Sequence, residues 1–222
     1  MPKASLHRLQ ANLQYLQAQG QISLSADEQA LMQQSPGNFS AQQLLDLSER
    51  SGHSLSTLLT KALDHTPQDL RFLVMDCDGV LTDGGMTFTK NGDEIKRFNA
   101  KDGMGIKRLQ KAGWQTGIIS AGISTGLVEH RAKMLGIENV YVGKEPKLEI
   151  LKSWLARLQL SFNQVAYIGD DISDLPILQA AGFSACPADA VKTVKECVSK
   201  VLELKGGEGC VRELIDDHLL PE

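Results

Sequence analysis

Short apolar segments alternate with helical patterns from residue 71 onward, and this alternation limits the fold more than any other feature. The expected strands are 71–75, 115–119, 140–142, 165–168 and 183–186. The expected helices between and after them are 104–111, 125–135, 148–158, 174–180 and 190–204. Strands that alternate with helices in this way form a parallel sheet covered by helices on both faces. We therefore expect an α/β fold with a doubly wound, Rossmann-like parallel sheet.

The alternation is interrupted once, between the first expected strand and the first expected helix. Two segments of alternating polarity, 86–89 and 94–98, flank Lys90-Asn91-Gly92-Asp93. Asn-Gly between such segments is a strong signal for a β-hairpin. The sequence therefore predicts a hairpin that projects from the sheet domain as a flap.

Residues 1–70 differ in composition from the rest of the chain and predict a small all-helical extension. They contain eleven glutamines, and leucines recur at helical spacing at positions 6, 9, 13 and 16. The expected helix boundaries are capping boxes at Ser25 and Ser40, a turn at 35–38, a helix end at Gly52 and a helix from Ser54 to about His65. A hinge at Thr66-Pro67 divides the chain into this extension (1–70) and a sheet domain (71–222).

The extension carries no motif that points to chemistry. Residues 40–64 resemble a helix-turn-helix, but residues 1–70 hold four basic side chains against six acidic ones, which argues against DNA binding. We interpret the extension as a packing or oligomerisation module.

The whole-chain composition excludes several classes of protein. The 222 residues carry a net charge of −4, which argues against a nucleic-acid partner. Apolar runs are too short for a membrane span or a signal peptide. The four cysteines, at 77, 186, 197 and 210, have neither metal-binding nor disulfide-framework spacing. We therefore expect reduced thiols and a cytoplasmic protein.

Polar residues follow three of the expected strands at their carboxyl ends. Asp76, Ser120 and Asp170 take these positions, and Lys147 can join them from a loop. In open α/β sheets, ligands bind outside the carboxyl ends of the strands. The sequence therefore predicts one site that collects acids, a hydroxyl and an ammonium group.

Asp76 and Asp78 form the most informative pair in this site. Carboxylates two residues apart on an extended chain point the same way. One can then attack a substrate while its neighbour handles a proton. Gly169-Asp170-Asp171 adds carboxylates, and Mg²⁺ prefers one or two protein carboxylates together with phosphate oxygens and water. Lys147 would balance the charge of a phosphoryl group, and Ser120 would hydrogen-bond one of its oxygens.

These residues resemble the four motifs of the haloacid dehalogenase-like phosphatases. More narrowly, residues 71–218 are similar to the 3-deoxy-D-manno-octulosonate 8-phosphate phosphatase family. The segments that carry the narrower resemblance are 80–84 (VLTDG), 98–103 (FNAKDG), 167–171 (YIGDD) and 206–213 (GGEGCVRE). The resemblance implies a haloacid dehalogenase-type fold, a magnesium cofactor, an acidic sugar-phosphate substrate and a role in lipopolysaccharide biosynthesis.

The resemblance also implies a role for each matching residue. Asp76 corresponds to the nucleophile that forms an aspartyl-phosphate, and Asp78 to the acid/base. Phosphate binding falls to Ser120, Ala121 and Lys147. The implied magnesium ligands are Asp76, the backbone carbonyl of Asp78, and Asp170, with Asp171 supporting the metal from behind.

Two departures concern substrate recognition. Many family members carry Gly-Arg after the second motif, whereas Ala121-Gly122-Ile123 follows Ser120 here, and Ile123 stands in place of the arginine that would grip an acidic sugar. Arg131 is a possible substitute. Neither the 43 residues between Asp76 and Ser120 nor the 22 between Lys147 and Asp170 leave room for a cap domain. The family closes such a site as a homotetramer, with packed hairpins and a glycine-rich tail that reaches a neighbouring site. From this we expect deletion of residues 205–222 to affect turnover without unfolding the domain.

Three other functions compete with the leading one. The first is a phosphatase of a nine-carbon 2-keto-3-deoxy acid 9-phosphate. The second is a sugar phosphomutase, which the absence of a cap disfavours. The third is a non-catalytic phosphatase-like oligomerisation module, which the presence of Asp76, Asp78, Lys147 and Asp170 disfavours.

Overall fold

The computed structural model describes residues 3–18, 20–34, 38–60, 70–122 and 125–220. The chain divides into two compact units, Met1–Thr66 and Pro67–Glu222, and each is described by itself. The expected turn at 35–38, the hinge at Thr66-Pro67, the helix end near His65 and the position of Ile123 lie wholly or partly outside the described residues.

The first unit contains helices at the following positions: α1 (Lys3–Ala18), α2 (Ala26–Gln34), α3 (Ala41–Ser51) and α4 (Leu55–Thr60). Ser40 and Gln43 form a capping box at the start of α3, and Gly52 ends this helix in the left-handed conformation, with φ 70°. Leu9, Leu13 and Leu16 of α1 are buried in a core of their own. The unit therefore has the apolar interior that its leucine spacing predicts.

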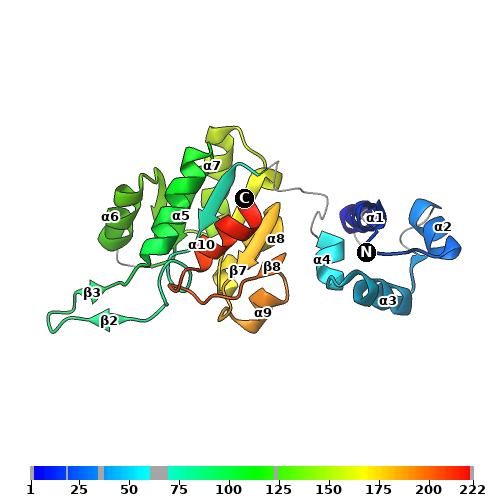
Figure 1. The fold of residues 1–222 in the computed structure, drawn as a ribbon, viewed down its shortest axis with the longest axis horizontal. Coiled ribbons are helices and arrows are strands. Elements are labelled where there is room, and N and C mark those ends of the chain that lie inside the picture. Colours follow the sequence, from blue (N-terminus) through cyan, green and yellow to red (C-terminus); the bar gives the residue numbers. More distant parts are fainter. Residues whose placement is uncertain (1–2, 19, 35–37, 61–69, 123–124, 221–222) are drawn as a thin grey trace. The chain divides into compact units, whose positions relative to one another are not determined.

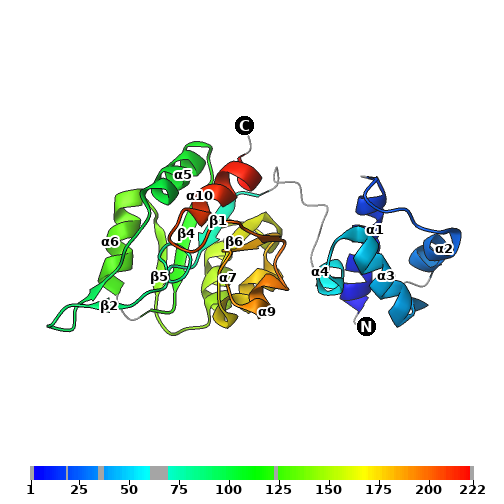
Figure 2. The same cartoon turned by 60° about the horizontal axis from the view of Figure 1, so that its bottom comes forward.

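A six-stranded parallel sheet forms the centre of the second unit, in the order β5-β4-β1-β6-β7-β8. Its strands are β1 (Phe72–Met75), β4 (Gln115–Ser120), β5 (Asn139–Val142), β6 (Val165–Ile168), β7 (Phe183–Cys186) and β8 (Lys200–Val201). The larger helices are α5 (Ala100–Lys111), α6 (Thr125–Leu135), α7 (Lys147–Leu158) and α8 (Leu175–Ala180). Shorter helical segments are α9 (Lys192–Lys195), α10 (Cys210–Leu214), η3 (Phe162–Gln164), η4 (Ile172–Asp174) and η5 (Ile215–Leu219). The predicted doubly wound α/β fold is confirmed (Figures 1 and 2).

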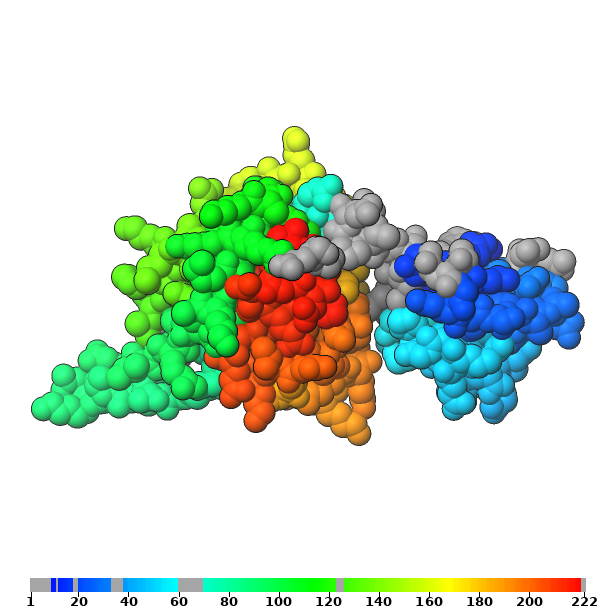
Figure 3. All heavy atoms as spheres, viewed as in Figure 1, coloured from blue at the N-terminus to red at the C-terminus, as the bar shows by residue number. Residues whose placement is uncertain are grey.

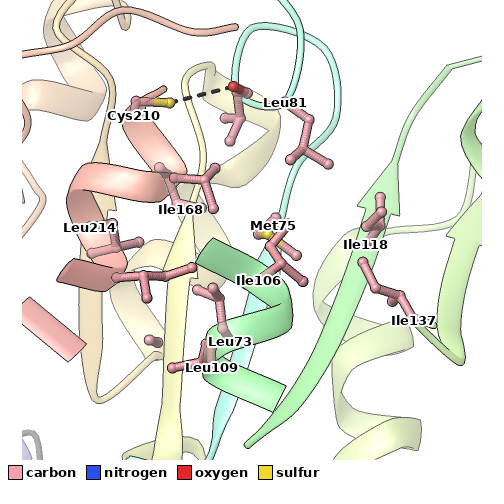
Figure 4. Packing of buried hydrophobic residues seen from close by; sticks show 14 of the residues in the cluster. Leu73, Met75, Leu81, Ile106, Leu109, Ile118, Ile137, Ile168, Cys210 and Leu214 are labelled. Carbon is pink, nitrogen blue, oxygen red and sulfur yellow. Dashed lines mark hydrogen bonds between the residues drawn. The ribbon is translucent and has the colours of Figure 1, made fainter. Parts of the chain in front are cut away.

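Alternate residues of β1 enter two separate cores, one on each face of the sheet. Leu73 and Met75 pack with α5, α6 and α10, and Figure 4 shows Ile106 and Leu109 of α5 near them. Phe72 and Val74 belong to the opposite core, together with residues of α7 and α8. Because β1 is covered on both faces, its apolar run is continuous, as expected for a central parallel strand.

The predicted helix over 190–204 is wrong. Only Lys192–Lys195 is helical there, and Lys200–Val201 forms β8, which pairs with Ala185 and Cys186 of β7. The backbone N–H groups of Ser199 and Leu202 donate to Ser184 and Cys186 of that strand. Pairing along the open edge of β7 satisfies backbone groups that a helix would leave exposed, and it overrides the local helical spacing.

The hairpin contains β2 (Thr87–Phe88) and β3 (Glu94–Ile95), and it projects from the second unit (Figures 1 and 3). Gly92 at its turn has φ 90°, a conformation that glycine adopts without strain. Met86, Phe88 and Ile95 are more than half exposed. The hairpin therefore presents apolar side chains at its surface.

The C-terminal segment completes the core of its own domain. Helix α10 lies beside α5 in both ribbon views, and Cys210, Val211, Leu214 and Ile215 are fully buried. The expectation that deletion of 205–222 leaves the domain folded is therefore wrong, because the deletion would open the core around β1. The described part of the tail folds back onto this domain instead of extending away from it.

Among the described residues, no helix is both long and apolar enough to cross a bilayer.

Asp102 links α5 to the C-terminal segment through a hydrogen bond. Its Oδ1 accepts a hydrogen bond from the backbone N–H of Arg212 at 2.8 Å, while its Oδ2 is buried without a partner among the described residues. Burial raises the pKa of Asp102 to about 6, although the N–H groups of Arg212 and Val211 and the charge of Arg131 oppose this rise. The folded domain therefore favours the protonated carboxyl.

Asp102→Asn should remove a pH dependence of stability. The native carboxyl stabilises the fold fully below its unfolded pKa of 3.8, and this contribution is lost as pH rises through about 6. The difference is on the order of 3 kcal/mol at most. Urea unfolding, followed by the fluorescence of Trp114 and Trp154, should show the variant gaining stability relative to the native protein between about pH 4 and about pH 6.5, the range in which the native carboxyl loses its contribution. Asp217→Asn, at an exposed carboxylate of the same segment, is the control; equal pH dependence in the native protein and Asp102→Asn would contradict the assignment.

Candidate active site

Three neighbouring strands deliver polar residues to one edge of the sheet. β1 lies between β4 and β6, and all three run parallel. Ser120 ends β4, and Asp76 and Asp170 follow β1 and β6 closely. The backbone N–H of Asp76 donates to Ile168 at 3.0 Å, which continues the ladder to the edge. The sheet therefore brings these predicted site residues together.

Lys147 links two carboxylates at this edge. Its Nζ lies 2.9 Å from Oδ1 of Asp76 and 2.7 Å from Oδ1 of Asp174. All three side chains are less than one-tenth exposed. Lys147 is the first residue of α7, so the start of this helix fixes the backbone position from which the side chain extends.

Asp174 is a site residue that the sequence analysis assigned only to the start of a helix. Its Oδ1 accepts from Lys147 and from the hydroxyl of Tyr167, at 2.7 and 2.6 Å. Its Oδ2 accepts from the backbone N–H groups of Asp170 and Asp171, at 3.0 and 3.3 Å. The signal for it was the spacing of four residues from Asp170, which the short η4 turn folds back into the site. Asp171, by contrast, caps η4 with an exposed side chain.

The crowding of carboxylates changes their protonation. Burial, and then the charge of Asp174, raise the pKa of Asp76 to about 7 against the opposing effect of Lys147. Burial and the charges of Asp174 and Asp171 likewise raise the pKa of Asp170 to about 7. Burial lowers the pKa of Lys147, but Asp76 and Asp174 outweigh it and the net shift is upward. The site therefore has more negative charge than its lysine balances.

The same residues fit a divalent cation. One oxygen from each of Asp76, Asp170 and Asp174 lies within 4.8 Å of the others. Asp170 Oδ1 is buried and has no hydrogen-bond partner among the described residues. Gly79, with φ 86°, makes room for this carboxylate, because a Cβ there would lie 2.1 Å from Asp170 Oδ2. An unpartnered carboxylate oxygen in an acidic cluster is the donor that Mg²⁺ prefers.

Asp78 faces a cavity of about 550 Å³ between the site and the hairpin. The cavity lining also includes Lys96, Ala121 and Gly122. Lys96 Nζ donates to Asp78 Oδ1 at 2.5 Å. Lys96 was not among the predicted site residues; it reaches the site because the return strand of the hairpin ends beside Asp78.

Ser120 and Asp78 both have a side-chain oxygen close to Gly122. A Cβ on Gly122 would lie 3.1 Å from Ser120 Oγ and 3.3 Å from Asp78 Oδ2. Ser120 is fully buried, and its Oγ accepts from the backbone N–H of Gly122, so this contact leaves the hydroxyl proton free to donate. Ser120, Ala121 and Asp78 are thus brought together.

Arg131 is placed differently from these residues. Its guanidinium lies 5.5 Å from the centre of the Phe98 ring and donates to the carbonyl of Asn99 at 3.0 Å. Arg131 thus links α6 to the segment that follows the hairpin, and it is not among the residues that line the cavity beside Asp78.

The glycine-rich tail contacts the loop that carries the aspartates. The N–H of Gly207 donates to the carbonyl of Val80 at 2.9 Å, and the side chain of Asn99 donates to the carbonyl of Gly207 at 3.1 Å. A Cβ on Gly206 would lie 2.0 Å from the carbonyl oxygen of Gly79. The backbone of the tail therefore packs directly against the backbone of this loop and supports it.

Comparison with known proteins agrees with this geometry. Residues 101–182 match the family model of the haloacid dehalogenase-like hydrolases. The chain is 36% identical over 176 residues to 3-deoxy-D-manno-octulosonate 8-phosphate phosphatase KdsC of Salmonella typhi, which covers 78% of this chain and 93% of that protein.

Solved structures agree as well. A probable YrbI family phosphatase from Pseudomonas syringae is 46% identical, with a TM-score of 0.65 over 67% of this chain and 84% of that one. The Moraxella catarrhalis 3-deoxy-D-manno-octulosonate 8-phosphate phosphatase, in complex with magnesium, phosphate and KDO, is 32% identical, with a TM-score of 0.65 over 67% and 85% of the two chains.

These matches and the fold define a haloacid dehalogenase-like hydrolase that acts on phosphoric monoesters. Within that class, the chain belongs to the 3-deoxy-D-manno-octulosonate 8-phosphate phosphatase family.

Gly206→Ala should displace the loop that carries Asp76 and Asp78, because the added Cβ meets backbone and not a flexible side chain. Overpacking of this kind costs about 1–3 kcal/mol. We expect a lower melting temperature and a reduced phosphatase rate at saturating substrate. Gly126→Ala, at a position of α6 with no atom within 4 Å, is the matched control and should be neutral or slightly stabilising. Indistinguishable behaviour of the two variants would show that the tail does not support the loop.

Proposed function

We propose that this chain is a magnesium-dependent phosphatase of an acidic sugar phosphate, with 3-deoxy-D-manno-octulosonate 8-phosphate as its substrate. The observation that carries the proposal is the buried Asp76, in contact with Lys147 at 2.9 Å, with Asp78 two residues further along the same loop. The names of the family members from Salmonella typhi and Moraxella catarrhalis support the choice of substrate.

In the first proposed step, a carboxylate oxygen of Asp76 attacks phosphorus and the bond to the sugar oxygen breaks. Asp78 gives its proton to that oxygen, so the sugar leaves as an alcohol and Asp76 carries the phosphoryl group. Lys147 neutralises the phosphoryl oxygens, and Ser120 donates its free hydroxyl proton to one of them. Phosphoryl transfer depends mainly on such positioning and charge compensation.

In the second step, Asp78 takes a proton from water, whose oxygen attacks phosphorus. The acyl-phosphate bond breaks, inorganic phosphate forms, and Asp76 returns to its carboxylate. Asp78 thereby regains the proton that it spent. Covalent catalysis of this kind divides one difficult displacement into two easier ones.

The magnesium ligands are proposed to be Asp76, Asp170 and the backbone carbonyl of Asp78. When bound, Mg²⁺ would shield the carboxylates and polarise the phosphoryl group. Asp174 already accepts four hydrogen bonds, so we assign it the role of orienting Lys147 and the Asp170 loop. Asp171, which was expected to support the metal, caps η4 with its exposed side chain.

A homotetramer built through the hairpins is proposed as the active assembly. The described second unit has no cap over the cavity beside Asp78, and Met86 and Phe88 line that cavity while being 72% and 56% exposed. A symmetric assembly would cover each of these surfaces equivalently. The free cysteines of the described chain agree with a cytoplasmic location, which we also propose.

Phosphate release from a panel of sugar phosphates tests the function. With Mg²⁺, the eight-carbon 8-phosphate should be the best substrate, and EDTA should abolish release until Mg²⁺ is restored. Asp76→Asn should be inactive, because an amide is a poor nucleophile. A preference for the nine-carbon 9-phosphate would replace the substrate assignment, and full activity in excess EDTA would refute the metal.

Asp78→Asn should separate substrates by their leaving groups. A sugar alkoxide needs protonation to leave and p-nitrophenolate does not, and general acid–base catalysis contributes about 10²–10⁴-fold. We expect sugar-phosphate turnover to fall at least about 100-fold. Release of the first equivalent of p-nitrophenol, measured by stopped flow, should be much less affected. Sugar-phosphate turnover within a few-fold of native would exclude Asp78 as the acid/base.

Light scattering tests the assembly. The native protein should have the mass of four chains, and Phe88→Asp should dissociate it, while Lys90→Asp on the same hairpin, a polar position, should leave it intact. A fully active native monomer would contradict the proposed assembly.

A further inference from the structure

Lys96 has a side chain that is largely shielded from solvent, on a hairpin whose residues are mostly exposed. Its side chain is 6% exposed, although it lies just after β3 of the projecting hairpin. Its Nζ contacts Asp78 Oδ1 at 2.5 Å and Glu94 Oε1 at 2.9 Å. Glu94 and Lys96 are two residues apart, so an extended chain directs both side chains to the same face. A buried ion needs such partners, since an unpaired one is strongly destabilising.

The two oxygens of Asp78 have different surroundings. Oδ1 accepts from Lys96 and, at 3.4 Å, from the hydroxyl of Thr82. Oδ2 faces Gly122, where a Cβ would lie within 3.3 Å of it and within 3.1 Å of Ser120 Oγ. One oxygen is thus held by the hairpin, while the other is turned toward the hydroxyl that would bind phosphate.

We propose that Lys96 is a positioning residue, which holds Asp78 by Oδ1 so that Oδ2 is the oxygen that exchanges protons with the sugar and with water. This inference rests on the acid/base role of Asp78 proposed above. Two contacts to Oδ1 select one rotamer of a short side chain, and proton transfer requires the oxygen to lie within hydrogen-bond reach of the reacting atom.

The hairpin therefore has a function within its own subunit. The carboxylate of Glu94 balances the charge of Lys96 and orients its ammonium group. The position of the hairpin therefore determines the position of Asp78 through the Glu94-Lys96 pair. Arg97, the next residue, lacks this role: its side chain is 76% exposed, and it pairs with Asp83, whose side chain is 44% exposed. The two adjacent cations offer a matched comparison.

Lys96→Met tests the proposal, with Arg97→Met as control and Lys96→Arg as the conservative variant. For 3-deoxy-D-manno-octulosonate 8-phosphate, we expect kcat of Lys96→Met to fall about 10-fold or more, as part of the 10²–10⁴-fold acid–base contribution. The first-equivalent burst with p-nitrophenyl phosphate should stay within a few-fold of native. Arg97→Met should match the native enzyme with both substrates, and Lys96→Arg should recover part of the loss.

A double-mutant cycle with Asp78→Asn separates positioning from a general structural effect. If Lys96 acts through Asp78, Lys96→Met should cost little more once Asp78 is already replaced. The inference is overturned if Lys96→Met retains native sugar-phosphate turnover, slows both substrates equally, or adds its full effect to Asp78→Asn. Native turnover in Asp78→Asn itself would instead overturn the proposed function.

Discussion

The contact of Lys147 with Asp76 and Asp174 is the interaction on which the site depends. Two buried carboxylates and the half-buried Asp170 at the end of a sheet would repel one another, and this single ammonium group holds the two buried ones at 2.9 and 2.7 Å. It leaves a negative excess; burial first, and then the charge of Asp174, raise the pKa of Asp76 and of Asp170 to about 7. An environment with that excess favours a divalent cation, and burial makes the interaction strong because little water screens it.

The surrounding fold holds this cluster with backbone contacts. The parallel pairing of β4, β1 and β6 sets the spacing of Ser120, Asp76 and Asp170. Gly79, in the loop that follows β1, makes room for the side chain of Asp170, and Gly206 of the tail packs closely against the carbonyl of Gly79. Because α10 is anchored in the core around β1, the tail that precedes it is held against this loop.

Sequence patterns were sufficient wherever a residue's position follows from its nearest neighbours in the chain. Asp76, Ser120 and Asp170 were found because they follow apolar strands. Contacts between distant segments were not predictable: Lys96 meets Asp78 only once the base of the hairpin is packed beside the Asp78 loop, and Gly206 meets Gly79 across more than a hundred residues. The strand at Lys200–Val201 was missed for the same reason, since its partner is the edge of β7.

The central claim is that Asp76 carries the phosphoryl group during turnover. Its most direct test is acid quenching of Asp78→Asn during reaction with p-nitrophenyl phosphate and Mg²⁺, followed by peptide mass spectrometry. The account predicts a phosphorylated peptide in which the modified residue is Asp76, in an amount that matches the released p-nitrophenol. A phosphoryl group on another residue, or release of p-nitrophenol with no phosphorylated peptide, would contradict it.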